Sequence, residues 1–109
     1  MPEEIEFFQV VEAADLPEGE RLFFEIDGQP IVLVHQDGEF FAVGDVCTHD
    51  DGPLGEGDVE GCQIVCPRHG ARFDLRTGKV LSMPAVVDIP AYPVRVNDGW
   101  VEIGWKTEA

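Results

Sequence analysis

Short apolar segments follow one another along the first half of the chain, and turn residues separate them. Residues 5–12 (IEFFQVVE) are aromatic and β-branched, which is typical of a β-strand. Residues 31–35 are almost entirely apolar, so we expect a strand that is buried on both faces. Asp-Gly pairs at 27–28 and 37–38 are strong hairpin signals because both residue types tolerate a left-handed backbone. An antiparallel meander is therefore predicted, with its other strands at residues 21–26 and 40–43.

The second half contains a segment, residues 44–70, in which glycine and proline are frequent. Only Val59 and residues 63–65 within it resemble strands, so we expect a loop-rich insertion. Loops held by a rigid scaffold commonly carry binding residues. Strand pairing is predicted between residues 73–75 and 79–81, and a final hairpin around Asn97-Asp98-Gly99. No window forms a convincing amphipathic helix, so the predicted fold class is all-β.

Length and composition are those of a globular domain. The chain has 109 residues, of which 44% are hydrophobic, enough to bury one core without disulfides. We therefore expect a single domain, residues 1–109. No apolar run approaches the roughly 18 residues that a membrane-spanning helix needs. The N-terminus is acidic, whereas a signal peptide begins with basic residues, so we expect a cytoplasmic protein.

The charge is strongly negative, because 22 acidic residues against 7 basic ones give a net charge of -15. Such a chain repels phosphate backbones and anionic lipids, so we expect no nucleic acid and no membrane as a partner. The negative charge agrees with a role in solubility, and it agrees equally with steering toward positively charged protein partners. Composition alone leaves these two interpretations open.

Two short segments contain most of the cysteine and histidine. They are the first loop, Cys47-Thr48-His49, and the second loop, Cys66-Pro67-Arg68-His69-Gly70, separated by residues 50–65. Each loop supplies one thiolate and one imidazole. The chain has three cysteines, an odd number, and two of them lie beside histidines. In a reducing compartment this pattern favours metal binding over a disulfide framework.

Zinc and an iron–sulfur cluster are the two candidates for this ligand set. Structural zinc sites usually place two cysteines close together in one segment and two histidines in another, whereas here each loop mixes the two residue types. A Rieske centre also uses two cysteines and two histidines, with both histidines on the same iron. The spacing favours the cluster but leaves zinc open.

The sequence around these residues resembles a known family. The two loops with their flanks resemble the Rieske motif C-x-H…C-x-x-H, and residues 73–80 (FDLRTGKV) are similar to the continuation in ferredoxins of bacterial ring-hydroxylating oxygenases. The resemblance implies one Rieske-type 2Fe-2S cluster and a Rieske-like fold of antiparallel sheets. It also implies a cluster-binding subdomain, at about residues 44–76, inserted in a basal β domain. The implied ligands are Cys47 and Cys66 on the inner iron, and His49 and His69 on the outer iron near solvent.

Four positions differ from the Rieske proteins of respiratory cytochrome bc complexes. Those proteins carry an extra cysteine in each loop, and the two form a disulfide; the corresponding residues here are Gly52 and Arg68. Those proteins also have a serine and a tyrosine whose hydroxyls donate hydrogen bonds to sulfur, at the positions of Ala71 and Phe73. Such hydrogen bonds stabilise the reduced, more negative state, so their loss is expected to lower the redox potential. The acidic charge acts in the same direction, although exposed charges are screened.

The resemblance implies a soluble one-electron carrier that accepts electrons from a flavin-dependent reductase and delivers them to a terminal oxygenase. The chain has no room for a flavin or nicotinamide domain. His35 is the only other histidine, so an iron site with two histidines and one carboxylate cannot form. We therefore expect an electron-transfer component and not an enzyme. The alternatives are a Rieske small subunit of a nitrite-reductase-like system, a protein associated with iron–sulfur assembly, and a zinc-stabilised binding module.

Four other residues have a structural interpretation beside a functional one. Cys62 is either a spare ligand or a half-buried structural thiol, and the complete motif favours the structural thiol. His35 lies outside both loops, which favours a structural histidine. Arg68 and Arg72 are rare positive charges in this chain. They either fix loops through local contacts, which is the interpretation we favour, or form a docking point for a partner.

Overall fold

The computed structural model describes residues 4–48, 52–68, 70–83, 85 and 87–107. The predicted all-β architecture is confirmed, since the only helix among these residues is a 3-10 turn, η1 (Ala13–Asp15). The strands are β1 (Glu4–Glu12), β2 (Arg21–Ile26), β3 (Gln29–Gln36), β4 (Glu39–Gly44), β5 (Val59–Glu60), β6 (Gln63–Val65), β7 (Arg72–Asp74), β8 (Ala91–Tyr92), β9 (Val94–Asn97) and β10 (Trp100–Thr107).

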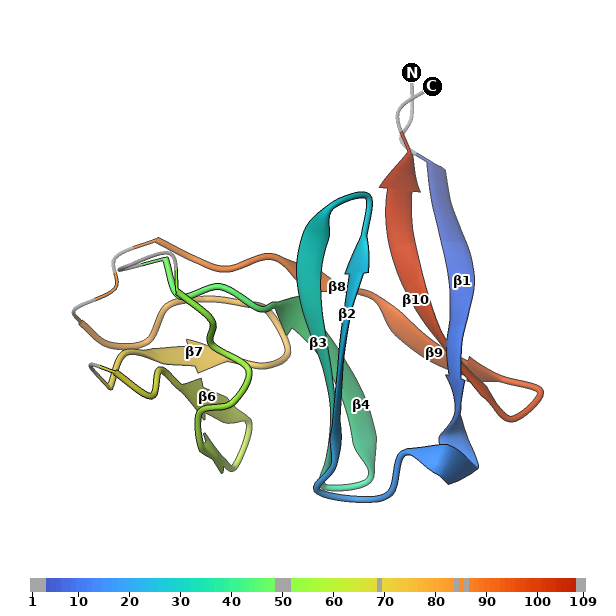
Figure 1. Cartoon of the computed structure of the whole chain (residues 1–109), viewed down its shortest axis with the longest axis horizontal. Coiled ribbons are helices and arrows are strands. Elements are labelled where there is room, and N and C mark those ends of the chain that lie inside the picture. The colour runs from blue at the N-terminus through green and yellow to red at the C-terminus, as the bar shows by residue number, and fades with distance from the viewer. Residues whose placement is uncertain (1–3, 49–51, 69, 84, 86, 108–109) are drawn as a thin grey trace.

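The strands form three antiparallel sheets. Their orders are β1-β10-β9, β2-β3-β4-β8 and β5-β6-β7. Figure 1 shows the first two sheets at the centre and right, while the small third sheet and the long loops form the other end of the molecule. The third sheet and its loops come from the glycine-rich middle of the sequence, so the insertion expected there is a separate structural layer.

The predicted meander is present, and its turns explain it. Asp27, Asp37 and Asp98 have φ angles of 55°, 53° and 54°, and the glycine that follows each has a φ of 77–79°. Two successive left-handed residues are the backbone of a type I′ turn, whose twist matches that of paired strands. These turns connect β2 to β3, β3 to β4 and β9 to β10.

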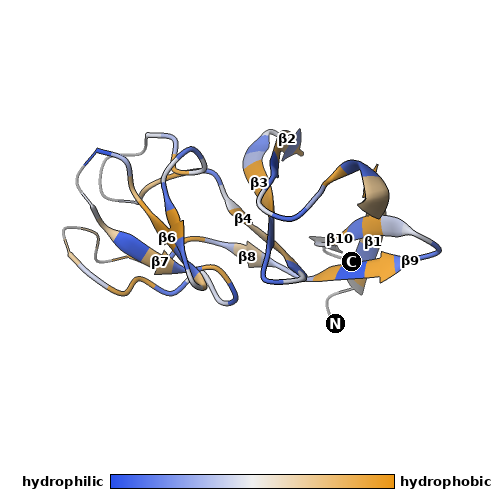
Figure 2. Ribbon diagram, turned by 90° about the horizontal axis from the view of Figure 1, so that it is seen from below, coloured by the Kyte–Doolittle hydropathy of each residue, from blue (hydrophilic) through white to orange (hydrophobic). Residues whose placement is uncertain are grey.

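The strand β3 is buried on both faces, as its apolar sequence predicts. Residues 31–34 are at most 1% exposed. Val32 and Val34 belong to a core that they share with the third sheet, whereas Ile31 and Leu33 belong to a core shared with β10. Figure 2 shows the sheet of β3 and β4 between these two layers. The central sheet therefore joins the loop-rich end to the sheet of the terminal strands.

Three features of the fold differ from the sequence prediction or were not predicted. The pairing expected between residues 73–75 and 79–81 is present only as an isolated bridge between Phe73 and Val80, flanked by backbone hydrogen bonds from Asp74 to Lys79 and from Leu81 to Arg72. The short strand β8 was not predicted. The pairing of β1 with β10, which joins the two ends of the chain, was not predicted either.

Candidate metal centre

The segment that contains Cys47, residues 45–57, begins where β4 leaves the central sheet and is called the first loop from here on. The Asp45 carboxylate accepts hydrogen bonds from the backbone N–H groups of Leu54 (3.0 Å) and Gly55 (2.6 Å), which folds the loop back on itself. Within this fold the Cys47 N–H donates to the Gly52 carbonyl at 2.7 Å. Cys47 has no exposed surface. The loop therefore presents a buried thiol from a backbone that is fixed at both of its ends.

The second loop is the connection between β6 and β7. The Cys66 N–H donates to the Ala71 carbonyl at 2.7 Å, and the Gly70 N–H donates back to the Cys66 carbonyl at 3.0 Å. Gly70 has a φ of 77°, a left-handed conformation that glycine adopts at no steric cost. Cys66 is 1% exposed. A tight turn thus presents the second thiol, and it is as buried as the first.

The described part of the site fits a metal cluster. Cys47 and Cys66 are thiols and belong to one buried core, together with Leu54, Ala71 and Phe73. A thiolate in such apolar surroundings is costly unless a cation compensates its charge, and coordination to iron supplies that compensation. His49 and His69, the other two predicted ligands, lie outside the described residues.

Arg21 anchors the first loop to the central sheet. From β2, its guanidinium donates to the carbonyl of Gly57 at 2.6 Å and also to the carbonyl of Gly55. Gly55 lies so close to the sheet that a Cβ there would come within 2.6 Å of the Phe23 ring. The sequence analysis missed the roles of Arg21 and Asp45, because both side chains bond backbone groups of the loop, and such partners leave no sequence signal.

Replacing Arg21 with methionine is expected to lower the free energy of unfolding by about 1–3 kcal/mol, because loop carbonyls lose charge-assisted donors. Urea unfolding followed by tryptophan fluorescence measures this loss. Arg76→Met is the matched control, since Arg76 pairs with Glu39 at 2.9 Å and both side chains are about half exposed. The control is expected to cost less than about 1 kcal/mol. Equal losses in the two variants would contradict the anchoring role.

The other singled-out residues make structural contacts. His35 bonds the Leu16 carbonyl through Nδ1 (2.8 Å) and stacks on Phe40, with 4.1 Å between ring centroids. Cys62 is half-buried and packs against the core that contains Cys47 and Cys66, which agrees with a structural thiol. Arg72 on β7 pairs with Glu60 at 3.1 Å, on β5 at the other edge of the same sheet. These contacts support the local interpretation of Arg72.

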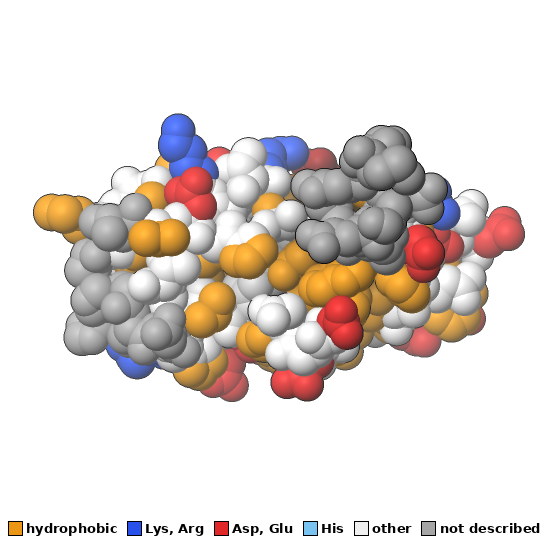
Figure 3. All heavy atoms as spheres, turned by 90° about the horizontal axis from the view of Figure 1, so that it is seen from above, with side chains coloured by type: hydrophobic (Ala, Val, Ile, Leu, Met, Phe, Trp, Pro, Cys, Tyr) orange, Lys and Arg blue, Asp and Glu red, His pale blue; other side chains and the backbone are white. Residues whose placement is uncertain are grey.

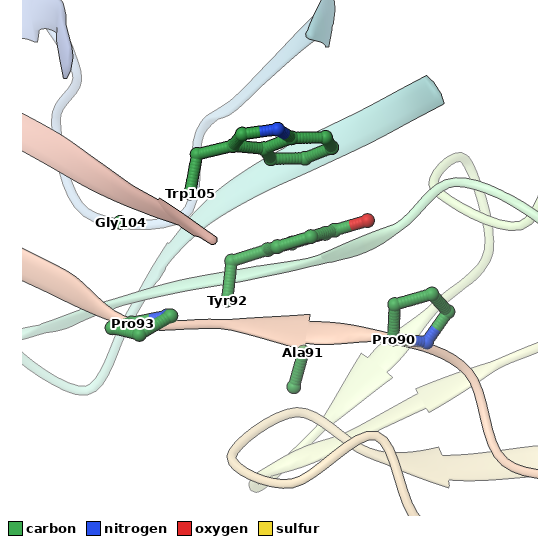
Figure 4. A pocket seen from close by; sticks show the side chains of 6 residues that line it. All are labelled: Pro90, Ala91, Tyr92, Pro93, Gly104 and Trp105. Atoms are coloured by element: carbon green, nitrogen blue, oxygen red, sulfur yellow. The ribbon is translucent and has the colours of Figure 1, made fainter. Parts of the chain in front are cut away.

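An aromatic pocket of about 260 Å³ lies between β8 and β10. Figure 4 shows the Tyr92 and Trp105 rings facing each other beside two prolines, and their centroids are 5.3 Å apart. Burial raises the pKa of the Tyr92 phenol. None of the residues that line the pocket is a cysteine or histidine. The pocket thus lies where β8 meets β10 and is not part of the metal centre.

Exposed apolar side chains follow the second loop along the chain. Leu81, Met83 and Val87 are 44%, 78% and 58% exposed. The Thr48 hydroxyl donates to the Val87 carbonyl, which brings this segment beside the first loop. Figure 3 shows several hydrophobic side chains at the surface of this end of the molecule. Grouped exposed apolar side chains are typical of protein contact surfaces.

The comparison with known families identifies the domain. Residues 6–93 match the model of the Rieske 2Fe-2S domain. The chain belongs to the Rieske family. The predicted fold and cofactor are thereby confirmed, and the cofactor of this Rieske domain is a 2Fe-2S cluster.

Individual relatives of this Rieske domain are ferredoxins. The ferredoxin subunit of the 3-phenylpropionate/cinnamic acid dioxygenase of Escherichia coli K12 is 43% identical over 88 residues, which cover 79% of this chain and 81% of that protein. The structure of the Sphingomonas yanoikuyae B1 ferredoxin is 32% identical, with a TM-score of 0.82 over 92% of this chain and 99% of that one. The ferredoxin resemblance seen in the sequence is confirmed.

A third similar structure contains two components of one system. It is the complex of reduced oxygenase and oxidized ferredoxin in carbazole 1,9a-dioxygenase, with a TM-score of 0.81 at 32% identity over 89% of this chain and 91% of that one. Ferredoxin components of this kind transfer electrons and do not catalyse the oxygenation. These relatives confirm the expectation that the chain is an electron-transfer component and not an enzyme.

Proposed function

We propose that this protein is a soluble one-electron carrier that passes electrons from a flavin-dependent reductase to a terminal oxygenase. The observation that carries the proposal is the pair of buried thiols, Cys47 and Cys66, on adjoining loops of a Rieske domain whose relatives are ferredoxins. The match extends over 99% of the Sphingomonas ferredoxin, so the similarity covers a whole carrier protein.

Four residues of the chain would hold the cluster, which supplies a site that stores one electron. Cys47 and Cys66 would bind as thiolates from the buried core, and His49 and His69 would bind as imidazoles. Leu54, which is fully buried, packs in the same core as the two thiols and excludes water from them. The chain's contribution is to bind, bury and tune the cluster.

The surface supports protein partners. The exposed Leu81, Met83 and Val87 lie on the segment that is bonded to the first loop, where a partner's redox centre would approach most closely. The net charge of -15 would steer a positively charged partner toward the carrier and disfavours nucleic acid and anionic membranes. The described helical residues contain no segment long and apolar enough to cross a membrane. We also propose a cytoplasmic location for the protein.

The domain organisation is part of the proposal. Residues 1–109 would form one Rieske domain, with a cluster-binding subdomain at about 44–76 inserted in the basal sheets. The separate sheet β5-β6-β7 and the two loops beside it support this division.

Anaerobic purification with iron and sulfide analysis tests the function. We expect about two iron and two sulfide per chain, visible charge-transfer bands and, after reduction, a Rieske-type electron paramagnetic resonance signal. Reduction by a flavoprotein reductase and reoxidation by a terminal oxygenase then test the carrier role. A colourless protein with stoichiometric zinc would refute the cluster, and a cluster that neither partner class oxidises or reduces would refute the carrier.

The redox potential is expected near the low end of the Rieske range of about -150 to +300 mV. Ala71 and Phe73 are fully buried beside the thiols and have no hydroxyl to donate to sulfur. A redox titration measures the potential, and a value above about +150 mV would contradict this argument. Ala71→Ser should raise the potential by adding a donor, whereas Ala85→Ser, in the same core, is the control.

A further inference from the structure

The side chain of Arg68 crosses from the second loop to the first. Arg68 follows Cys66 by two residues, and its Nη1 donates to the Pro53 carbonyl at 2.7 Å. A Cβ built on the neighbouring Gly52 would lie 2.8 Å from Cζ and Nη2 of the guanidinium and 3.1 Å from Nε. The guanidinium therefore lies directly against the Gly52 backbone, in a space that any larger residue would fill.

The contact continues to the first predicted thiolate ligand. The Gly52 carbonyl accepts the hydrogen bond of the Cys47 N–H at 2.7 Å. One guanidinium from the second loop thus contacts two consecutive residues, Gly52 and Pro53, and the first of them is bonded to Cys47. Contacts of a single side chain therefore connect the backbone segments that present Cys47 and Cys66.

We propose that Arg68 is a positioning residue, a non-covalent clasp that keeps the two loops closed over the cluster and slows its loss. The proposal rests on the ligand assignment made above. The clasp joins the loops through the bond from Arg68 to Pro53 and the contact with Gly52. Both contacts lie within the chain, so the effect of Arg68 is measured on the isolated protein without any partner.

The geometry uses properties that are specific to arginine and glycine. A guanidinium is planar, keeps its charge at every accessible pH and offers several donors, so it can bond the Pro53 carbonyl while its plane covers Gly52. A lysine at position 68 would supply a point charge and one hydrogen bond, but it has no planar group to cover Gly52. A side chain at position 52 would displace the guanidinium.

The rate of cluster loss tests the clasp. Visible absorbance is followed in excess chelator for the wild type, Arg68→Lys and Arg68→Gln. Loss of the charge-assisted bond is expected to accelerate cluster loss roughly five- to tenfold in Arg68→Gln. Arg68→Lys should restore part of the wild-type rate. Arg76→Gln, which removes an equally charged arginine from a pair with Glu39, should stay within about twofold of the wild type.

Tryptophan fluorescence separates positioning from general stability. Trp100 and Trp105 lie on β10, in the terminal sheet, and report the unfolding of the basal structure. We expect Arg68→Gln to leave the denaturation midpoint of these tryptophans nearly unchanged while cluster loss is faster. A denaturation midpoint that falls in proportion to the increase in the rate of cluster loss would overturn the positioning role. Arg68 would then only stabilise the fold as a whole.

A double-mutant cycle with Gly52 completes the test. Gly52→Ala should accelerate cluster loss in the wild type, because the new Cβ displaces the guanidinium, but should add little in the Arg68→Gln protein. Additive effects would overturn the clasp. A wild type with a Rieske spectrum and an Arg68→Gln rate equal to that of the wild type would refute the clasp alone. A wild type without iron would refute the ligand assignment and, with it, the clasp.

Discussion

Replacement of Cys66 by serine is expected to yield a protein without a stable Rieske cluster, whereas Cys62→Ser is expected to keep the full iron and sulfide content. Cys66 is 1% exposed and shares its core with Cys47, so its thiolate is costly there unless a bound cation compensates the charge. A serine hydroxyl at the same position does not ionise near neutral pH and is a poor ligand for cluster iron.

The matched variant uses the third cysteine of the chain. Cys62 precedes Cys66 by only four residues and is half-buried at the margin of the same core. Iron and sulfide analysis, together with the electron paramagnetic resonance spectrum after reduction, compares the two proteins. A Cys66→Ser protein that retains the wild-type spectrum would remove Cys66 from the ligand set. Loss of the cluster in Cys62→Ser would show that the ligand set assigned from the motif is incomplete.

The strands that the sequence predicts are those whose signals are local. Asp-Gly pairs define the turns on either side of β3, and β3 is apolar on both faces because Val32 and Leu33 point into two different cores. The pairing of β1 with β10 depends on residues from opposite ends of the chain, such as Phe8 with Ile103. No local pattern specifies such a partner, and the pairing of β1 with β10 was accordingly not predicted.

In the candidate site, too, local sequence signals are predictable and long-range contacts are not. The cysteines and histidines of the two loops follow from their spacing and from the family resemblance, and as ligands they stay a prediction, whereas the family itself is identified by the Rieske match. The groups that hold the loops are not predictable in this way. Arg21, Asp45 and Arg68 all bond backbone N–H or carbonyl groups of the first loop, and every residue of a chain offers such groups. Only the folded structure selects which of them are used.

Gly78→Ala is expected to destabilise the protein by more than about 3 kcal/mol or to prevent folding. Gly78 has a φ of 76°, and a Cβ there would lie 2.0 Å from the Ile89 carbonyl oxygen. The Ile89 N–H also donates to the Gly78 carbonyl at 2.8 Å, so the two backbones cannot separate without losing this bond. Ile89 is buried in the core of the two thiols.

Gly61→Ala is the matched control, because it introduces the same kind of backbone strain without the close contact. Gly61 has a φ of 61° but no atom within 4 Å of its Cβ position, so the strain of a left-handed alanine, about 1 kcal/mol, is its whole expected cost. Urea unfolding measures both variants, and iron content shows whether the damage reaches the cluster. Similar losses in the two proteins would mean that the segment at Ile89 can shift away from Gly78. A much larger loss in Gly78→Ala is expected, since the adjacent Pro90 carbonyl is bonded to the Gly44 N–H at the end of β4, where the first loop begins.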